Sequence, residues 1–167
     1  MWLPTLEEVT DKTHFSSPTA YNTMTIPSTA EKVIKVAGYQ DLIGNIAEFS
    51  GTGSPNMALP NPDLAAPAVG ILTTSVGGRY DVYTGTSMAA PFVTGAAALM
   101  MQWGIIRGNA PFLHGERIKA FLRLGAARTA RTAYPNPTYG YGTLCLNNTM
   151  SYLERYQWGG FSTWLQT

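Results

Sequence analysis

The sequence predicts an α/β fold, and three features of its 167 residues support this prediction. Residues Val33–Tyr39 form a short run rich in β-branched side chains, which is typical of a buried strand. Residues 68–73 and 80–84 are two further strand candidates, joined by a turn that contains a Gly-Gly pair. A long helix of small and apolar residues is expected to run from Ser87 to about Trp103.

The segments around the first strand candidate are expected to be irregular. Residues 1–24 are polar and turn-rich and show no apolar period, so they predict an extended or loop segment before a domain over 25–167. Residues 50–63 predict another loop because they are rich in glycine, serine and proline. Each proline there disfavours helix in the residue before it.

The helix that begins at Ser87 is apolar on nearly every face, which predicts a position at the centre of a domain. Pro91 falls in its first turn, where the ring should loosen the bond back to Ser87; a proline simply tolerated at this position explains the pattern equally well. A membrane span is not expected, because several residues interrupt the apolar run. These residues are Pro91, Thr94, Gly95, Gln102 and Gly104.

Two shorter helices are expected after it. Residues 115–124 place Ile118, Phe121 and Leu122 on one face, while the charged residues lie largely elsewhere. Residues 147–156 predict a last short helix.

The composition excludes some function classes. The formal net charge of +1 argues against electrostatic binding of nucleic acid. Only 13% of the residues are charged, against about 25% in a typical soluble domain, which suits segments that are buried on several sides. Cys145 is the single cysteine, so no disulfide can form within the chain, and a small core residue is the favoured interpretation. The N-terminus shows no signal-peptide pattern, and the compartment stays undetermined.

Ser87 is the candidate nucleophile. It follows Gly85 and Thr86 at the start of the long helix, where backbone N–H groups lack partners and the helix dipole is positive. Those amides could stabilise an oxyanion that forms beside the serine. The structural alternative is a helix N-cap, the commonest role of serine at such positions.

The segment Gly-Thr-Ser-Met-Ala-Ala-Pro-Phe-Val-Thr-Gly-Ala-Ala-Ala-Leu (85–99) resembles the active-site serine segment of subtilisin-like serine proteases. Further stretches resemble landmarks of the same family in the same order over residues 25–145: 25–30, 33–39, 49–51, 62–67 and 139–142. Residues 101–111 with 115–122 resemble the clostridial spore-germination (Csp-type) members, which leaves a secreted or spore-associated parent open.

The resemblance implies the C-terminal portion of a subtilisin-like parallel-sheet α/β domain, with a central helix starting at the nucleophile. Ser87 would attack a peptide carbonyl of a polypeptide substrate and form an acyl-enzyme, and Thr86 would support the oxyanion. Gly85 and Thr84 would lie at the substrate. No cofactor is implied in this chain, and calcium binding stays open for a longer enzyme. Ala68 departs from the family pattern Ala-Pro-Gly-Val, in which its position is glycine.

The resemblance also implies partners that this chain does not contain. In the family the order is Asp, His, Ser, yet the Asp-Thr/Ser-Gly and His-Gly-Thr-His motifs are absent here. His14 lacks the following Gly-Thr, and His114 comes after the serine, so both are interpreted as surface or loop histidines. Asn22 is not assigned the oxyanion role of the family's asparagine. We therefore expect this chain alone to be inactive and to need the missing N-terminal part of the catalytic domain.

A second hypothesis is a catalytically inactive remnant that acts as a binding or assembly module. A parallel sheet cut partway through leaves an unpaired edge, which predicts homo-oligomers formed through that exposed edge. A nucleophile elbow of the Gly-x-Ser-x-Gly type is not indicated, because Met88 and Ala89 follow Ser87.

Overall fold

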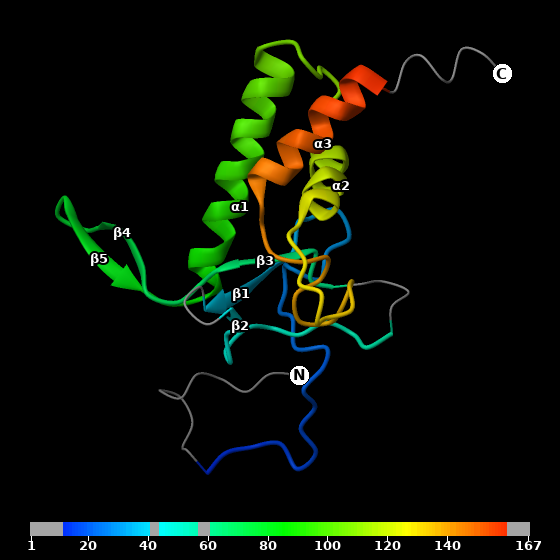
Figure 1. Ribbon diagram of the computed structural model, residues 1–167. Coiled ribbons are helices and arrows are strands. Elements are labelled where there is room, and N and C mark those ends of the chain that lie inside the picture. Colours follow the sequence, from blue (N-terminus) through cyan, green and yellow to red (C-terminus); the bar gives the residue numbers. More distant parts are fainter. Residues whose placement is uncertain (1–11, 41–43, 57–60, 160–167) are drawn as a thin grey trace.

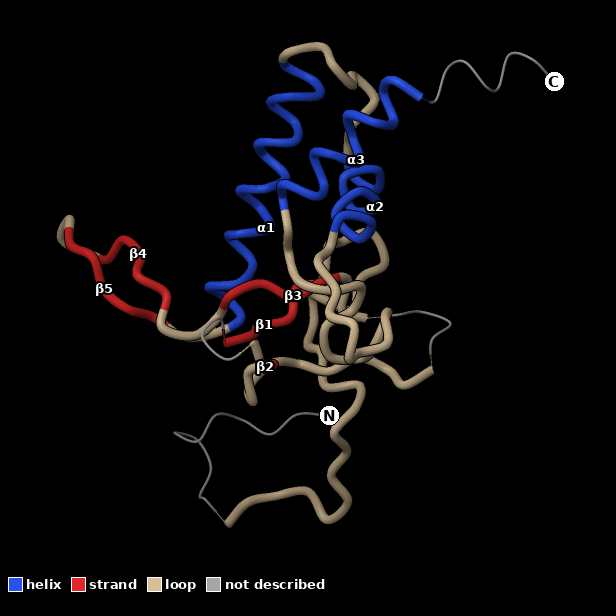
Figure 2. Tube along the Cα trace, in the orientation of Figure 1, coloured by secondary structure: helices blue, strands red, loops and turns tan. Residues whose placement is uncertain are grey.

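The computed structural model describes residues 12–40, 44–56 and 61–159, so the predictions for residues 1–11 fall outside the described part. It combines a small sheet, a hairpin and helices (Figures 1 and 2). The elements, in chain order, are β1 Val36–Gln40, β2 Asn45–Ile46, β3 Leu64–Pro67, β4 Ile71–Ser75, β5 Arg79–Tyr83, α1 Thr86–Met101, the π-helical turn η1 Gln102–Ile106, α2 Gly115–Gly125 and α3 Leu146–Gly159. The predicted α/β class is confirmed. The division into 1–24 and 25–167 stays a prediction.

The three-stranded sheet has the order β2-β1-β3. Strand β1 runs parallel to β3, with Val36 opposite Leu64 and Tyr39 opposite Pro67, and antiparallel to the short β2. The outer side of β3 is hydrogen-bonded at Ala65, whose N–H donates to Gly142 and whose carbonyl accepts from Leu144. The parallel pair places the end of β3 beside the end of β1, and the chain then forms β4 and β5 before it reaches α1.

The predicted strand over 68–73 is wrong in its bounds. The structure ends β3 at Pro67 and begins β4 at Ile71. Gly70 lies between them with φ of +67°, a conformation that strand residues do not adopt. The chain therefore leaves the sheet here instead of continuing it.

Strands β4 and β5 form an antiparallel hairpin that projects from the body of the molecule (Figure 1). The predicted Gly-Gly turn closes it, since Gly77 and Gly78 both have positive φ, as tight hairpin turns require. Every residue of β5 is exposed. The hairpin is antiparallel and separate from the parallel pair, so the homo-oligomer expected through an edge of the parallel sheet stays a prediction.

The helices pack on one another and on the sheet through a single apolar cluster. Helices α2 and α3 lie close enough that a Cβ at Gly125 would come 2.5 Å from the Cα of Thr149. Helix α1 packs on β1 and β3 through its buried face. The fully buried large apolar side chains are Leu64, Met100, Leu113, Leu122 and Leu153.

Helix α1 is buried on one face only, which differs from the expectation of a central helix. Its buried residues are Ala89, Val93, Ala96 and Met100. Phe92 and Leu99, on another face, are 42% and 53% exposed. The sequence of α1 is apolar on nearly every face, but the described residues cover only one of these faces.

A buried carboxylate joins α2 to the sheet. Asp63, just before β3, is fully buried and accepts from the backbone N–H of Lys35 at 2.6 Å. Arg123 donates to Oδ1 through both Nε and Nη2, and the Lys119 Nζ lies 3.3 Å from Oδ2. Because donors reach both carboxylate oxygens, this charge is held in the interior without an unpaired oxygen.

Candidate active site

Ser87 lies exposed in the first turn of α1. The residue that caps the helix is Gly85, with φ of 151° and ψ of 160°, and no side chain makes a capping hydrogen bond. The N-cap alternative for Ser87 is therefore wrong. Its hydroxyl is presented to solvent at the helix terminus, beside backbone N–H groups that have no partner within the helix.

The loop before Ser87 is fixed to the sheet by backbone hydrogen bonds. Ala68 donates to the carbonyl of Tyr39 at 2.9 Å, at the end of β1, and its own carbonyl accepts from Gly85 at 2.8 Å. The N–H of Gly70 donates to the Thr84 hydroxyl at 3.0 Å. This chain of contacts holds Gly85, and therefore the start of α1, at the end of the parallel strand pair.

Position 68 is alanine here, where the family pattern has glycine. The extra methyl group is accommodated by Gly38 on the neighbouring strand. A Cβ built at Gly38 would meet the Ala68 Cβ at 2.6 Å, closer than two side chains can approach. The same position lies 3.4 Å from the Thr86 methyl group. The methyl of Ala68 thus occupies space that Gly38 leaves empty, and the loop keeps its hydrogen bonds.

Thr86 and Ser87 together form the candidate oxyanion site. Thr86 is half-buried with its methyl toward β1, and Ser87 follows it in the first helical turn. A negative charge developing here would face the positive end of α1 and the N–H of Ser87. The residues predicted from the sequence lie in one contiguous stretch, with Thr84 and Gly85 before α1 and Thr86 and Ser87 in its first turn.

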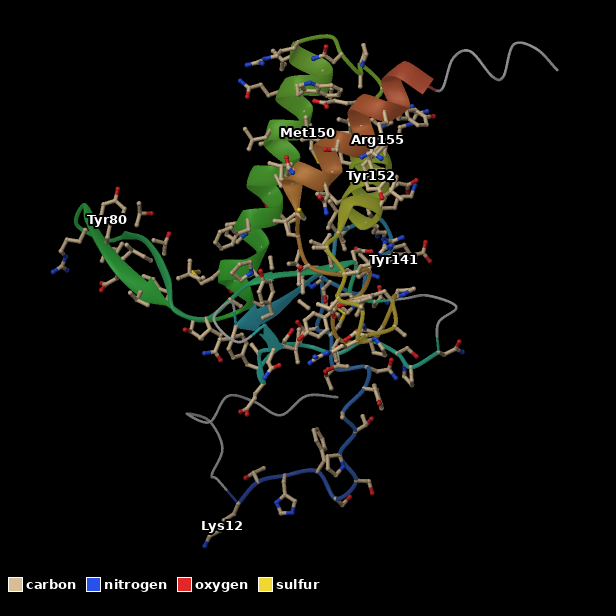
Figure 3. The ribbon with its side chains drawn as sticks, viewed as in Figure 1. Lys12, Tyr80, Tyr141, Met150, Tyr152 and Arg155 are labelled. Carbon is tan, nitrogen blue, oxygen red and sulfur yellow. The ribbon has the colours of Figure 1, made fainter. Side chains whose placement is uncertain are left out.

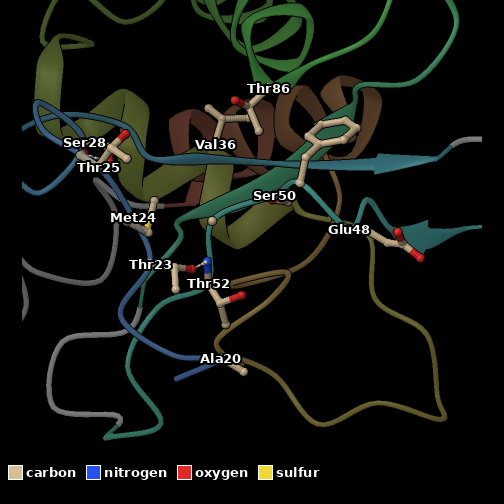
Figure 4. A pocket seen from close by; sticks show the side chains of 12 residues that line it. Ala20, Thr23, Met24, Thr25, Ser28, Val36, Glu48, Ser50, Thr52 and Thr86 are labelled. Atoms are coloured by element: carbon tan, nitrogen blue, oxygen red, sulfur yellow. Dashed lines mark hydrogen bonds between the residues drawn. The ribbon is translucent and has the colours of Figure 1, made fainter. Parts of the chain in front are cut away.

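A cavity of about 590 Å³ adjoins Thr86 (Figure 4). Its walls come from the segment after residue 20, from residues 48–52 and from β1, and the bond from the Thr52 N–H to the Thr23 hydroxyl at 2.8 Å joins two of them. Glu48 is the single ionisable side chain among the lining residues. Sequence reasoning did not assign a role to Glu48 or Met24, although residues 49–51 were recognised as a family landmark. The lining residues are Ala20, Thr23, Met24, Thr25, Ser28, Val36, Glu48, Phe49, Ser50, Gly51, Thr52 and Thr86.

Neither histidine reaches Ser87 within the described residues. The ring of His14 hydrogen-bonds to the carbonyl of Lys12, in the N-terminal segment at the bottom of Figure 3. His114 precedes α2 and follows Leu113, which packs against Gly104 in η1. Since α1 rises about 1.5 Å per residue, η1 lies more than about 20 Å from Ser87. Both histidines are exposed, as expected.

In the part of the chain that the structure describes, no group of three or more His, Cys, Asp or Glu side chains could hold a metal ion. Cys145 is only partly buried, so its interpretation as a core residue is not confirmed. The candidate reactive group is the hydroxyl of Ser87, at the exposed start of α1.

Comparison with known proteins decides the family. Residues 10–142 match the subtilase family of peptidases. The chain belongs to the subtilases. The structure of the Clostridium perfringens CspB protease is 51% identical and superposes with a TM-score of 0.81, covering 85% of this chain and 31% of that one. Serine protease AprX of Bacillus subtilis is 29% identical over 148 residues, or 77% of this subtilase chain and 32% of AprX.

The matches extend to other subtilases. Subtilisin-like protease SBT3.5 of Arabidopsis thaliana is 41% identical over 90 residues, which are 45% of this chain and 11% of that protein. The chain thus spans about a third or less of these relatives. The subtilase assignment confirms the predicted subtilisin-like serine protease family and its α/β fold.

Proposed function

We propose that this subtilase chain carries the nucleophile of a serine endopeptidase whose general base is supplied by polypeptide outside these residues. The observation that supports it most directly is Ser87, exposed at the amino end of α1 and free of any capping role. A family match supports peptidase chemistry, and the helix terminus supplies the electrostatics that an oxyanion needs.

The reaction proceeds in two balanced steps. In the first, the Ser87 Oγ bonds to the scissile carbonyl carbon, its proton passes to the base, and the peptide C–N bond breaks as the base protonates the leaving amine. In the second, the base takes a proton from water as the water oxygen bonds to the ester carbonyl carbon, the C–O bond to Ser87 breaks, and the base returns that proton to the Ser87 Oγ. Thr86 and the Ser87 N–H stabilise the oxyanion in both, and Thr84 and Gly85 contact the substrate backbone.

The cavity beside Thr86 is the proposed position of a substrate side chain. It adjoins the residue next to the nucleophile, and its walls are mostly threonine, serine and small apolar groups. The carboxylate of Glu48 at its wall favours a substrate with a positive charge nearby, by an amount limited by solvent screening.

Labelling with a fluorophosphonate tests the proposal. The reagent phosphonylates a serine only when a base activates it, so we expect no labelling of the chain alone. Strong labelling is expected when the complementary part of CspB is present. Ser87→Ala is the control that must abolish it, while Ser151→Ala, at a second helical serine, must not. Failure to label a folded complex would contradict the proposal.

The alternative function is a binding or assembly module without activity. It is favoured by the distance of both histidines from Ser87 and by the exposed apolar face of α1. A complex that forms but never labels would select it.

A further inference from the structure

A further cavity lies between the end of β1, the short strand β2 and the connection from α2 to α3. It has a volume of about 520 Å³ and shares no lining residue with the cavity beside Thr86. This volume is within the usual range of small-molecule sites. We call it the arginine–tyrosine cavity, and its principal lining residues are Tyr39, Asn45, Arg128, Arg131, Tyr134 and Tyr139.

Hydrogen bonds within the protein hold the walls of this cavity in place. The Tyr139 hydroxyl donates to the carbonyl of Gly44 at 2.8 Å, which joins the α2–α3 connection to the residue before β2. The backbone N–H groups of Ala127 and Thr143 each donate to the carbonyl of the other residue, at 2.8 and 2.9 Å. The cavity is therefore formed before a ligand arrives, as small-molecule sites usually are.

Two arginines bring positive charge to the cavity. Arg128 donates from Nε to the carbonyl of Tyr141 at 2.9 Å and from Nη2 to the carbonyl of Arg123 at 3.1 Å. These carbonyls orient the guanidinium but carry no net charge. Arg131 is exposed, and the ion pairs of the described residues are both formed with Asp63 instead. Because no lining residue is acidic, an anion that enters the cavity meets a net positive charge.

Three tyrosines line the same cavity. Tyr39, Tyr134 and Tyr139 are all half-buried, so each keeps part of its surface open. Aromatic rings pack well on planar and apolar groups, and apolar or aromatic walls with a few polar groups are typical of ligand sites. The lining thus combines cations for an acidic group with rings for a planar body.

We propose that the arginine–tyrosine cavity binds a small organic anion, either an aromatic carboxylate or an aryl phosphate. The oxyanion of the ligand pairs with the guanidinium groups of Arg128 and Arg131, and its planar body packs among the tyrosines. Guanidinium groups form charge-assisted hydrogen bonds with carboxylate and phosphate oxygens alike, so the shared chemistry is an oxyanion on an aromatic body. The proposal does not depend on the reaction at Ser87.

Two larger ligands fit the cavity less well. A nucleic-acid backbone needs an extended row of cations, whereas this chain has a formal net charge of +1 and places two arginines in one concavity. An extended acidic polypeptide also fits less well, because a cavity of about 520 Å³ encloses one compact group.

Isothermal titration calorimetry of the full chain tests the proposal with probes that share one ring system. The probes are 2-naphthoate, 2-naphthyl phosphate and the neutral 2-naphthamide. We expect each anion to bind one-to-one and the amide to bind about tenfold more weakly, because it cannot form the charge-assisted hydrogen bonds. The tighter of the two anions identifies the oxyanion that the cavity prefers. Inorganic phosphate should bind more weakly than 2-naphthyl phosphate, since it lacks the aromatic body.

Variants then locate the site. Arg131→Gln removes one charge at an exposed position and should raise the Kd for 2-naphthoate about tenfold. Arg79→Gln removes the same charge from the exposed strand β5, outside the cavity, and is the matched control that should leave Kd unchanged. Tyr134→Leu removes one ring and should weaken both anions. Circular dichroism checks that each variant is folded.

Several results would overturn the proposal. One is the absence of binding by both naphthyl anions at millimolar concentration. Equal affinities for 2-naphthoate and 2-naphthamide would show that the arginines do not recognise the ligand. Equal losses in Arg131→Gln and Arg79→Gln would place the anion outside this cavity. Binding of hexaglutamate that Arg131→Gln abolishes, without binding of the naphthyl anions, would assign the cavity to an acidic polypeptide.

Discussion

The surroundings of Asp63 and of Ser87 are opposites within the same small structure. Asp63 is fully buried, and Lys35, Lys119 and Arg123 all direct donors toward it. Ser87 is exposed, and its hydroxyl receives no hydrogen bond from a described histidine. The Asp63 carboxylate thus has its partners among the described residues, whereas Ser87 has no described histidine as a partner. Folding and catalysis should therefore respond to different substitutions.

The largest expected effect follows from this contrast. Ser87→Ala should lower turnover of the completed peptidase by about 10⁶, the loss measured for subtilisin itself, and leave the unfolding free energy within about 0.5 kcal/mol. The hydroxyl contributes no cap, so its removal costs the helix little. Peptide hydrolysis and urea denaturation measure the two quantities. A loss of stability above about 1 kcal/mol would show that Ser87 also supports the fold.

The complementary variant is Asp63→Asn. It leaves the charges of Lys119 and Arg123 without their carboxylate and turns an amide N–H₂ toward donors, so we expect a destabilisation of about 3–5 kcal/mol. Asp81→Asn, in the exposed strand β5, is the matched control and should be nearly neutral. Chemical denaturation measures both. Equal unfolding free energies of Asp63→Asn and Asp81→Asn would mean that the buried carboxylate does not stabilise the packing of α2 on the sheet.

A smaller effect on stability is expected from the packing between α2 and α3. Gly125→Ala places a Cβ 2.5 Å from the Cα of Thr149, so the helices must separate at a cost of about 1–3 kcal/mol. Gly95→Ala in α1 meets nothing within 4 Å and should stabilise or leave the protein unchanged. Thermal melts compare the two. The ordering of the melting temperatures would be reversed if α3 is free to move away from α2.

The sequence predicted those helices and strands whose signals lie within a short stretch of residues. The strand candidate 33–39, the Gly-Gly hairpin and the two later helices lie within a few residues of β1, β4–β5, α2 and α3. Strand β3 was missed because Leu-Ala-Ala-Pro has no β-branched signal, and its strand character comes from pairing with β1. The paired residues of β1 and β3 are far apart in the sequence, so a window of a few residues does not contain both.

The candidate site was predictable in part for the same reason. Residues 84–87 form one contiguous stretch, so their sequence alone placed them together. The Asp63 cluster joins residues 28 and 60 positions apart, and no spacing pattern indicated it. The one-sided burial of α1 was also beyond the sequence, because an all-round apolar helix does not show which of its faces this chain covers.

A smaller effect is expected from the residue beside the nucleophile. Thr86→Val keeps the methyl that faces Gly38 and removes the hydroxyl, so stability should hold while kcat of the completed peptidase falls by about 10². KM should change little, because an oxyanion forms only after binding. Steady-state kinetics separate the two constants. A rise in KM with unchanged kcat would assign Thr86 to substrate binding instead.

The smallest effect is a pH dependence at the Asp63 cluster. Burial, and then the charge of Lys119, lower the pKa of Lys35 from its ordinary value of 10.5, while Asp63 and Glu31 oppose the shift. Between the lowered pKa and 10.5 the unfolded chain binds more protons than the folded one, so stability rises with pH in that window. Below it, Lys35 is charged in both states and the full cost of burying the ammonium is present.

Lys35→Met removes this dependence, so the stability of the wild type relative to the variant should increase as pH approaches 10.5. Urea denaturation of both proteins at several pH values measures the difference, in which the titration of other groups cancels. Parallel curves would mean that Asp63 and the Asn61 side chain, which accepts from the ammonium at 2.8 Å, compensate the burial of Lys35 completely.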